Sequence, residues 1–198
     1  LGFMIGDERV DKHMPIPDWE TMIHTVRNSF PRGTAIIYAN DFVCGDSTHR
    51  NQTLEGRRRR KDPPPPPPNC LSSIPPALDW ISSDKYRQDT ASGFIGKIKQ
   101  MYQRAIYPKL QDHQKVAVIP GVGHPIDNFK ICDDSCTAQI ELQDAKDTVA
   151  WAQSDSRVAL VAPYRWSATG SETGLKQLSD ADDLRNYWQN FGKGTKRV

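Results

Sequence analysis

The sequence contains no long run of apolar residues, and this absence limits what the chain can be. Nothing approaches the ~18 consecutive apolar residues that a membrane-spanning helix needs, so no transmembrane segment is predicted. An excess of one charge is also missing, because 26 basic and 24 acidic residues leave a net charge of +2. Much of the basic excess lies in one run, Arg57 to Lys61, so we predict no nucleic-acid partner. The start at Leu1 resembles a strand rather than a signal peptide.

Motifs that mark several common enzyme classes are missing as well. Gly121-Val122-Gly123 lacks the third glycine and the helix start of a dinucleotide-binding fingerprint. There is no Ser-centred nucleophile elbow and no phosphate-binding glycine loop. These absences argue against dehydrogenases, kinases and serine hydrolases, and no cofactor is predicted. The spacing of Cys132 and Cys136, with two distant cysteines, lacks the paired pattern of zinc sites, so no metal is predicted.

The four cysteines indicate a disulfide-bonded protein. Cys44, Cys70, Cys132 and Cys136 allow three pairings, of which local closure of each loop is the simplest. The alternatives are four free thiols or a zinc site. Asn51-Gln52-Thr53 is an N-glycosylation sequon between the first two cysteines, which makes Asn51 a candidate glycosylation site. Together these features favour an extracellular or secretory-pathway location.

Apolar segments alternate with segments of helical period along the chain. The predicted strands are Leu1–Ile5, Ala35–Ala39, Leu78–Ser82, Val116–Ile119 and Val158–Ala162. The first predicted helix begins at Pro17, with Met22, Ile23, Val26 and Phe30 on one face. The other three cover Ile95 to Tyr107, Ala138 to Gln153 and Asp180 to Phe191. Because the strands are continuous apolar runs, they indicate a parallel sheet buried on both faces. An open doubly wound sheet and a (β/α) barrel both fit this pattern.

The chain is predicted to be one domain, residues 1–198, with a hydrophilic insertion. The insertion covers about residues 43–76 and contains Arg57 to Arg60 and Pro63 to Pro68, so we expect it to be disordered rather than packed core. An interaction motif or a cleavable basic site is the alternative. A complete eight-unit barrel takes ~250 residues, so 198 residues indicate only part of one.

Polar residues follow each predicted strand, at the end where parallel α/β folds place their sites. Carboxylates follow the first three strands, and aromatic and basic residues follow the last. Acids beside aromatic platforms suit a carbohydrate, because aromatic faces stack on sugar rings and carboxylates bind hydroxyls or exchange protons. The candidates are Asp7 and Glu8, Asn40 and Asp41, Asp84 and Tyr86, His124, and Tyr164, Arg165 and Trp166.

The segments Gly2–Glu8 and Ala35–Asp41 resemble the middle of a glycoside-hydrolase-like TIM barrel, and Leu78–Tyr86 and Val158–Trp166 resemble later strands. The resemblance implies that the chain is the last five of eight βα units. It also implies that Glu8, after the fourth strand, is the catalytic acid/base. The seventh strand ends in Pro120-Gly121 with no carboxylate, so the partner role falls to Asp84 or Asp41.

Within this scheme the other residues bind substrate. Asp7, Asn40, Tyr86, His124, Tyr164, Arg165 and Trp166 are the predicted substrate-binding residues. A separation near ~5 Å between the two catalytic carboxyls implies retention of configuration, and ~6.5–9.5 Å implies inversion. Each candidate also has a purely structural reading, as a cap, a turn residue or barrel-top packing.

Two functions therefore follow from the sequence. The first is a carbohydrate-active barrel that hydrolyses glycosidic bonds by carboxylate acid/base chemistry. The second is a catalytically inactive barrel that binds glycans or proteins. In either case five units leave open sheet edges, and the missing N-terminal half of the barrel is expected to be required.

Overall fold

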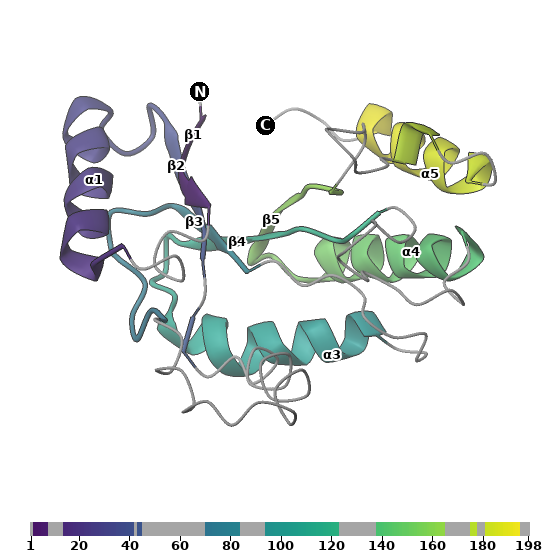
Figure 1. Cartoon of the computed structure of the whole chain (residues 1–198), viewed down its shortest axis with the longest axis horizontal. Helices are drawn as coiled ribbons and strands as arrows, with labels where there is room; N and C mark the ends of the chain where they lie inside the picture. The colour runs from purple at the N-terminus through teal and green to yellow at the C-terminus, as the bar shows by residue number, and fades with distance from the viewer. Residues whose placement is uncertain are drawn as a thin grey trace, which may run out of the picture. The chain divides into compact units, whose positions relative to one another are not determined.

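Five parallel strands form one sheet in the order in which they occur along the chain. The computed structural model describes residues 2–7, 14–41, 43–44, 70–83, 94–122, 138–164, 175–177 and 181–194. The sheet order is β1-β2-β3-β4-β5, and the strands are β1 Gly2–Asp7, β2 Ile36–Asn40, β3 Trp80–Ser82, β4 Lys115–Val118 and β5 Val158–Val161 (Figure 1). All five predicted strands are confirmed, with boundaries that differ by one or two residues.

Helices connect the strands where the apolar period predicted them. These are α1 Ile16–Ser29, α3 Phe94–Met101, α4 Ala138–Ser154 and α5 Asp182–Gly194. The helix predicted over Ile95 to Tyr107 continues beyond α3 as a π-helical turn, Tyr102–Ile106, and a 3-10 turn, Tyr107–Lys109. The strands are neighbours in chain order, without the reversal of order that marks a doubly wound sheet, so the fold class is confirmed as an open part of an α/β barrel.

One face of α1 differs from its prediction. The sequence favoured Met22 as part of the buried stripe, but Met22 is 41% exposed. Trp19 and Ile23 are fully buried instead, and Phe30, just after the helix, stacks at 4.5 Å between ring centroids on Phe3 of β1. The buried face therefore includes Trp19 in place of Met22, and a buried indole contributes more apolar area than a methionine.

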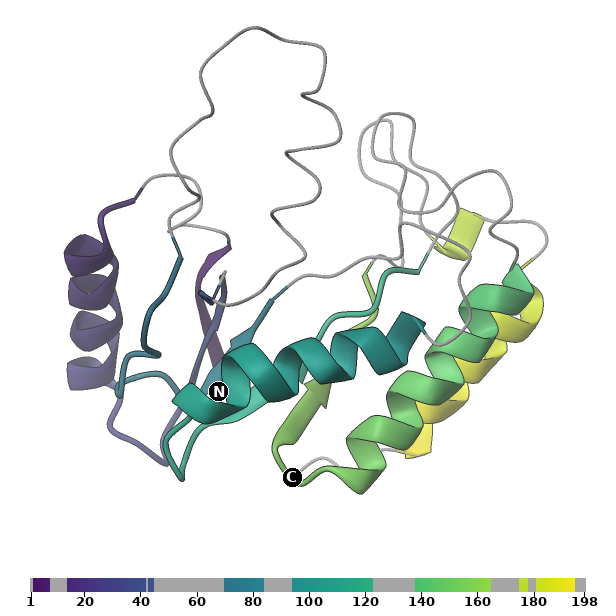
Figure 2. The ribbon, with the colours of Figure 1, turned by 90° about the horizontal axis from the view of Figure 1, so that it is seen from below.

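The chain divides into two compact units. One consists of Leu1–Ser83 and Lys99–Val116, and the other of Asp84–Ile98 and Ala117–Val198. In the second unit α4 and α5 lie side by side (Figure 2). Their core is built around Leu142, Val149, Leu184 and Trp188. The apolar faces of both helices therefore share one core.

The insertion is more ordered at its ends than predicted. The expectation that residues 43–76 are all disordered is wrong, because Val43, Leu71 and Ile74 are buried. Val43 pairs with Leu71 as a parallel bridge, and the amide of Cys44 donates to the carbonyl of Leu71 at 2.8 Å. Apolar residues flanking the polar tract thus extend the core to both of its ends, and residues 45–69 lie outside the described part.

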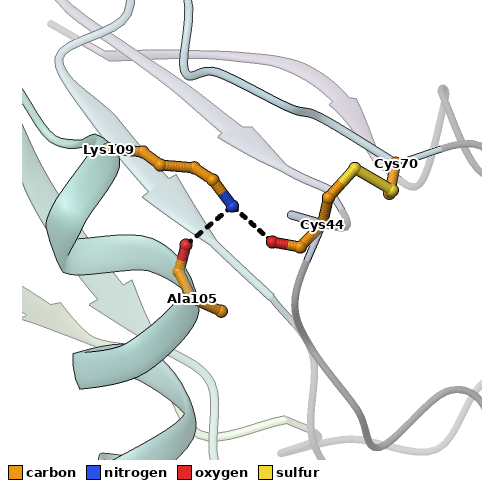
Figure 3. Close-up of a disulfide and its surroundings, with 4 residues drawn as sticks. All are labelled: Cys44, Cys70, Ala105 and Lys109. Atoms are coloured by element: carbon orange, nitrogen blue, oxygen red, sulfur yellow. Dashed lines mark hydrogen bonds between the residues drawn. A yellow bond between two sulfur atoms is a disulfide. The ribbon is translucent and has the colours of Figure 1, made fainter.

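The disulfide between Cys44 and Cys70 closes the insertion and confirms the predicted local pairing (Figure 3). Lys109 Nζ donates to the carbonyl oxygens of Cys44 and Ala105, the latter at 3.0 Å. Burial lowers the pKa of Lys109 below its ordinary value of 10.5. The root of the insertion is therefore tied to the end of the helical segment after α3. Cys132 and Cys136 lie outside the described residues.

Candidate functional site

The last residues of three neighbouring strands form a continuous polar row in the first unit. Asp7 ends β1, Asn40 ends β2 and Ser82 ends β3. The strand register pairs Asp7 with Asn40, and Asn40 with Ser82. Because the strands are parallel, all three residues lie at the carboxyl edge of the sheet, where α/β barrels place their sites.

A bulge in β1 brings Asp7 into this row. Met4 pairs with Tyr38 and Asp7 with Asn40, so three steps along β1 match two steps along β2. Gly6 within the bulge has φ +92°, a backbone conformation that residues with a Cβ rarely adopt. Bulges turn a side chain away from the direction that a regular strand would give it. Here the extra residue sets Asp7 opposite Asn40.

Hydrogen bonds join the row into one chain of side chains. Asn40 Nδ2 donates to Asp7 Oδ1 at 2.8 Å, and Ser82 Oγ donates to Asn40 Oδ1 at 2.7 Å. Tyr38 Oη forms a short hydrogen bond with Ser82 Oγ. Asn40 and Ser82 are buried, whereas Asp7 is exposed. The row therefore runs from the half-buried Tyr38 through buried Ser82 and Asn40 to a solvent-facing carboxylate.

Two further residues, Asp41 and Tyr102, hydrogen-bond to the backbone at the end of β3. Asp41 is fully buried, and its amide donates to the carbonyl of Ser82 at 3.0 Å. Tyr102 Oη both accepts from the amide of Ser83 and donates to its carbonyl, each at 3.1 Å. The backbone that carries Ser82 is thus fixed from both sides. A rigid backbone of this kind is what keeps a site's side chains in place.

The structure describes only some of the predicted site residues. Asp7 and Asn40 are in direct contact, and Asp41 is the enclosed neighbour of Asn40. Tyr164, in the second unit, follows β5 and is 40% exposed, and its backbone pairs with that of Gly121. The predicted residues outside the described part are Glu8, Asp84, Tyr86, His124, Arg165, Trp166 and the glycosylation candidate Asn51.

Two members of the row, Tyr38 and Ser82, were not predicted from the sequence. A usable signal was present, because alternate residues of a strand share a face and Tyr38 precedes Asn40 by two positions. Ser82 was counted as the end of an apolar strand. Its place beside Asn40 depends on the register between β2 and β3, which the sequence does not specify.

A depression lies at the amino-terminal ends of β2 and β3, opposite the polar row, and its lining carries charged side chains. Its volume is about 320 Å³, and its lining includes Arg32, Asp79, Trp80 and His113. Arg32 is already paired with Asp79 at 3.1 Å, and His113 Nε2 contacts the carbonyl of Pro76 at 3.2 Å. Because its charged groups bond to the protein itself, we do not choose it as the candidate site.

Within the residues that the structure describes, no cluster of three or more His, Cys, Asp or Glu side chains is arranged to hold a metal ion. The same part of the chain contains no helix long and apolar enough to cross a membrane. The candidate site is therefore described by side-chain carboxylate, amide and hydroxyl groups alone.

The fold and the strand-end row define part of a (β/α) barrel with a polar carboxyl edge. No protein-family model and no curated protein matches the chain. Among solved structures, the chain is similar to one described as a complex of a GH113 beta-1,4-mannanase, with a TM-score of 0.52 and 15% sequence identity. The match covers 95% of this chain and 55% of that one, so the chain spans about half of the mannanase. The chain therefore has the fold of part of a (β/α) barrel.

Proposed function

We propose that the chain is part of a secreted, carbohydrate-active barrel that hydrolyses glycosidic bonds at the carboxyl ends of its strands. The observation that carries this proposal is the polar row, in which buried Asn40 and Ser82 hold the exposed carboxylate of Asp7. A fixed carboxylate surrounded by neutral hydrogen-bonding groups suits a sugar hydroxyl better than it suits a charged substrate. The glycoside-hydrolase-like fold supports the same class of ligand.

The chemistry of bond cleavage is assigned to the carboxylates. Glu8 directly follows the bulged end of β1 and protonates the leaving oxygen. Asp84 or Asp41 is the partner, as the nucleophile or as the base for a water molecule. Asp84 is the preferred partner, because Asp41 is fully buried and a reacting carboxylate must reach the substrate. Tyr86 orients this partner.

The remaining predicted residues bind the sugar. Tyr164 and Trp166 provide aromatic faces after β5, and Arg165 and His124 contribute donors. Further βα units outside this chain complete the barrel, as the half-length match to the mannanase suggests. The Cys44–Cys70 disulfide supports an oxidising, secretory location, in which Asn51 is glycosylated.

A catalytically inactive glycan-binding barrel is the second candidate. It is favoured by the end of β4, where Pro120-Gly121 offers no carboxylate for a second catalytic role. Such a barrel keeps the hydroxyl-binding row and lacks the reacting pair. The two candidates therefore predict the same binding and different turnover.

The test is hydrolysis of aryl glycosides and polysaccharides, β-1,4-mannan included, by the full-length protein and its Glu8→Gln variant. We expect turnover that falls at least ~100-fold in the variant, the size typical of a lost acid/base group. Glu20→Gln, the same change on α1, is the matched control and should retain full activity. Glycan binding without turnover in the parent protein would establish the inactive barrel, and unchanged activity in Glu8→Gln would overturn the assigned role.

A further inference from the structure

The polar row has a direction that follows from counting protons. Asn40 is an amide with one acceptor oxygen, and Ser82 has a single hydroxyl proton. Ser82 Oγ donates that proton to Asn40 Oδ1, so it must accept from Tyr38 Oη. Asn40 Nδ2 in turn donates to Asp7 Oδ1. All three hydrogen bonds of the row therefore have their donors on the Tyr38 side and their acceptors on the Asp7 side.

Because the row ends on a donor, Asn40 Nδ2, the Asp7 carboxylate is an acceptor with one of its oxygens held in place. Oδ1 is held by Asn40, and the exposed side chain leaves Oδ2 open to a ligand that brings its own proton. A neutral sugar hydroxyl has this property, whereas a phosphate or carboxylate ligand repels the Asp7 charge. Hydrogen bonds in series also polarise one another, so the buried members strengthen the hold on Asp7.

We infer that Tyr38 and Ser82 are positioning residues that act through Asn40 to fix Asp7 for binding a sugar hydroxyl. This inference rests on the proposed function, because it assigns Asp7 a role in the same site. Ser82 and Tyr38 lie two and three hydrogen bonds away from Asp7, and the bulge at Gly6 sets the bond between Asn40 and Asp7. The row thus specifies a hydroxyl donor at Asp7, in addition to the acid/base chemistry at Glu8.

The first test is a double-mutant cycle on the full-length protein with the 4-nitrophenyl glycoside that it hydrolyses fastest. Tyr38→Phe should lower kcat/KM by roughly three- to ten-fold, the effect of one neutral hydrogen bond. Ser82→Ala should lower it more, because Asn40 Oδ1 loses its buried donor, and Ser82→Thr should restore most of the loss. In an Asp7→Asn background, both changes should have less than about a two-fold effect.

Ser29→Ala removes an exposed hydroxyl from α1 and should leave kcat/KM unchanged. A merely structural role for Tyr38 and Ser82 would instead lower kcat/KM by the same factor with and without Asp7, and that result would overturn the inference.

A second measurement separates this inference from the proposed function. If the parent protein hydrolyses no glycoside, the proposed function fails, and the row is judged by NMR couplings that report the side-chain rotamer of Asp7. Ser82→Ala should turn a single Asp7 rotamer into an average of several. A single unchanged rotamer in that variant would overturn the positioning role, whether or not the protein has activity.

Discussion

At the scale of single residues, Asp79 connects the start of β3 to two other parts of the first unit. Its carboxylate accepts from the Arg27 guanidinium on α1 and from the amide of Ile37 in β2, the latter at 2.7 Å. Arg32 forms a second ion pair with it at 3.1 Å. The side chains of Asp79 and Arg27 are only 13% and 12% exposed, whereas that of Arg32 is 44% exposed. The enclosed pair should therefore matter to stability and the exposed one should not.

We predict that Asp79→Ala lowers the free energy of unfolding by about 3–5 kcal/mol, because it leaves the buried Arg27 charge without its partner. Arg32→Ala is the matched control, and it should cost no more than about 1 kcal/mol because solvent screens its ion pair. Urea denaturation followed by circular dichroism measures both values. Equal losses in the two variants would contradict the distinction between an enclosed and an exposed pair.

At the same scale, only some of the residues in the polar row could be predicted from the sequence. Asp7 and Asn40 were predicted, because polar residues after apolar strands in a parallel fold converge at one edge. Tyr38 and Ser82 were not, because their contact depends on strand register. The bulge at Gly6 could not be predicted from the sequence either, since a glycine near the end of a strand is compatible with a turn, a bulge or a regular strand.

At the scale of elements, the sequence predicted most of what the structure shows. Continuous apolar runs located all five strands, and the 3.6-residue period located α1, α3, α4 and α5. The wrong assignments occur where a segment was judged by its amino-acid composition rather than by the spacing of its apolar residues. Residues 70–76 were assigned to the polar insertion although Leu71 and Ile74 are buried, because a proline-rich neighbourhood concealed a short apolar pattern.

The Cys44–Cys70 disulfide is the covalent closure of that insertion, and its effect follows from loop length. A separation of 26 residues corresponds to about 3.5 kcal/mol of stabilisation at 25 °C by restriction of the unfolded chain. We predict that the Cys44→Ala/Cys70→Ala double variant loses about this amount in urea denaturation. The parent protein unfolded in the presence of a reductant should lose at least as much, because the reductant also opens the bridge predicted between Cys132 and Cys136. A loss well below ~1 kcal/mol would show that the loop is already restricted without the covalent bond.

At the scale of the whole molecule, the order of the sheet leaves β1 and β5 at its two ends. Each has one neighbouring strand in the described part of the chain, and β1 also carries Met4, which is 54% exposed. A closed barrel has no such ends, and the chain spans about half the length of the barrel to which it is similar. The unpaired backbone of an end strand is a template for association with another chain.

We therefore predict that the 198-residue chain alone associates in solution, with a molar mass by light scattering that rises with concentration. Met4→Lys places a charge on β1 and should shift the protein towards the monomer, because a lysine on an edge strand opposes strand pairing. Met22→Lys is the matched control: Met22 is 41% exposed on a helix, α1, rather than on a strand, and its replacement should leave association unchanged. Equal effects of the two lysines would assign association to general surface hydrophobicity, and a monomer at every concentration would show that β1 needs no further strand.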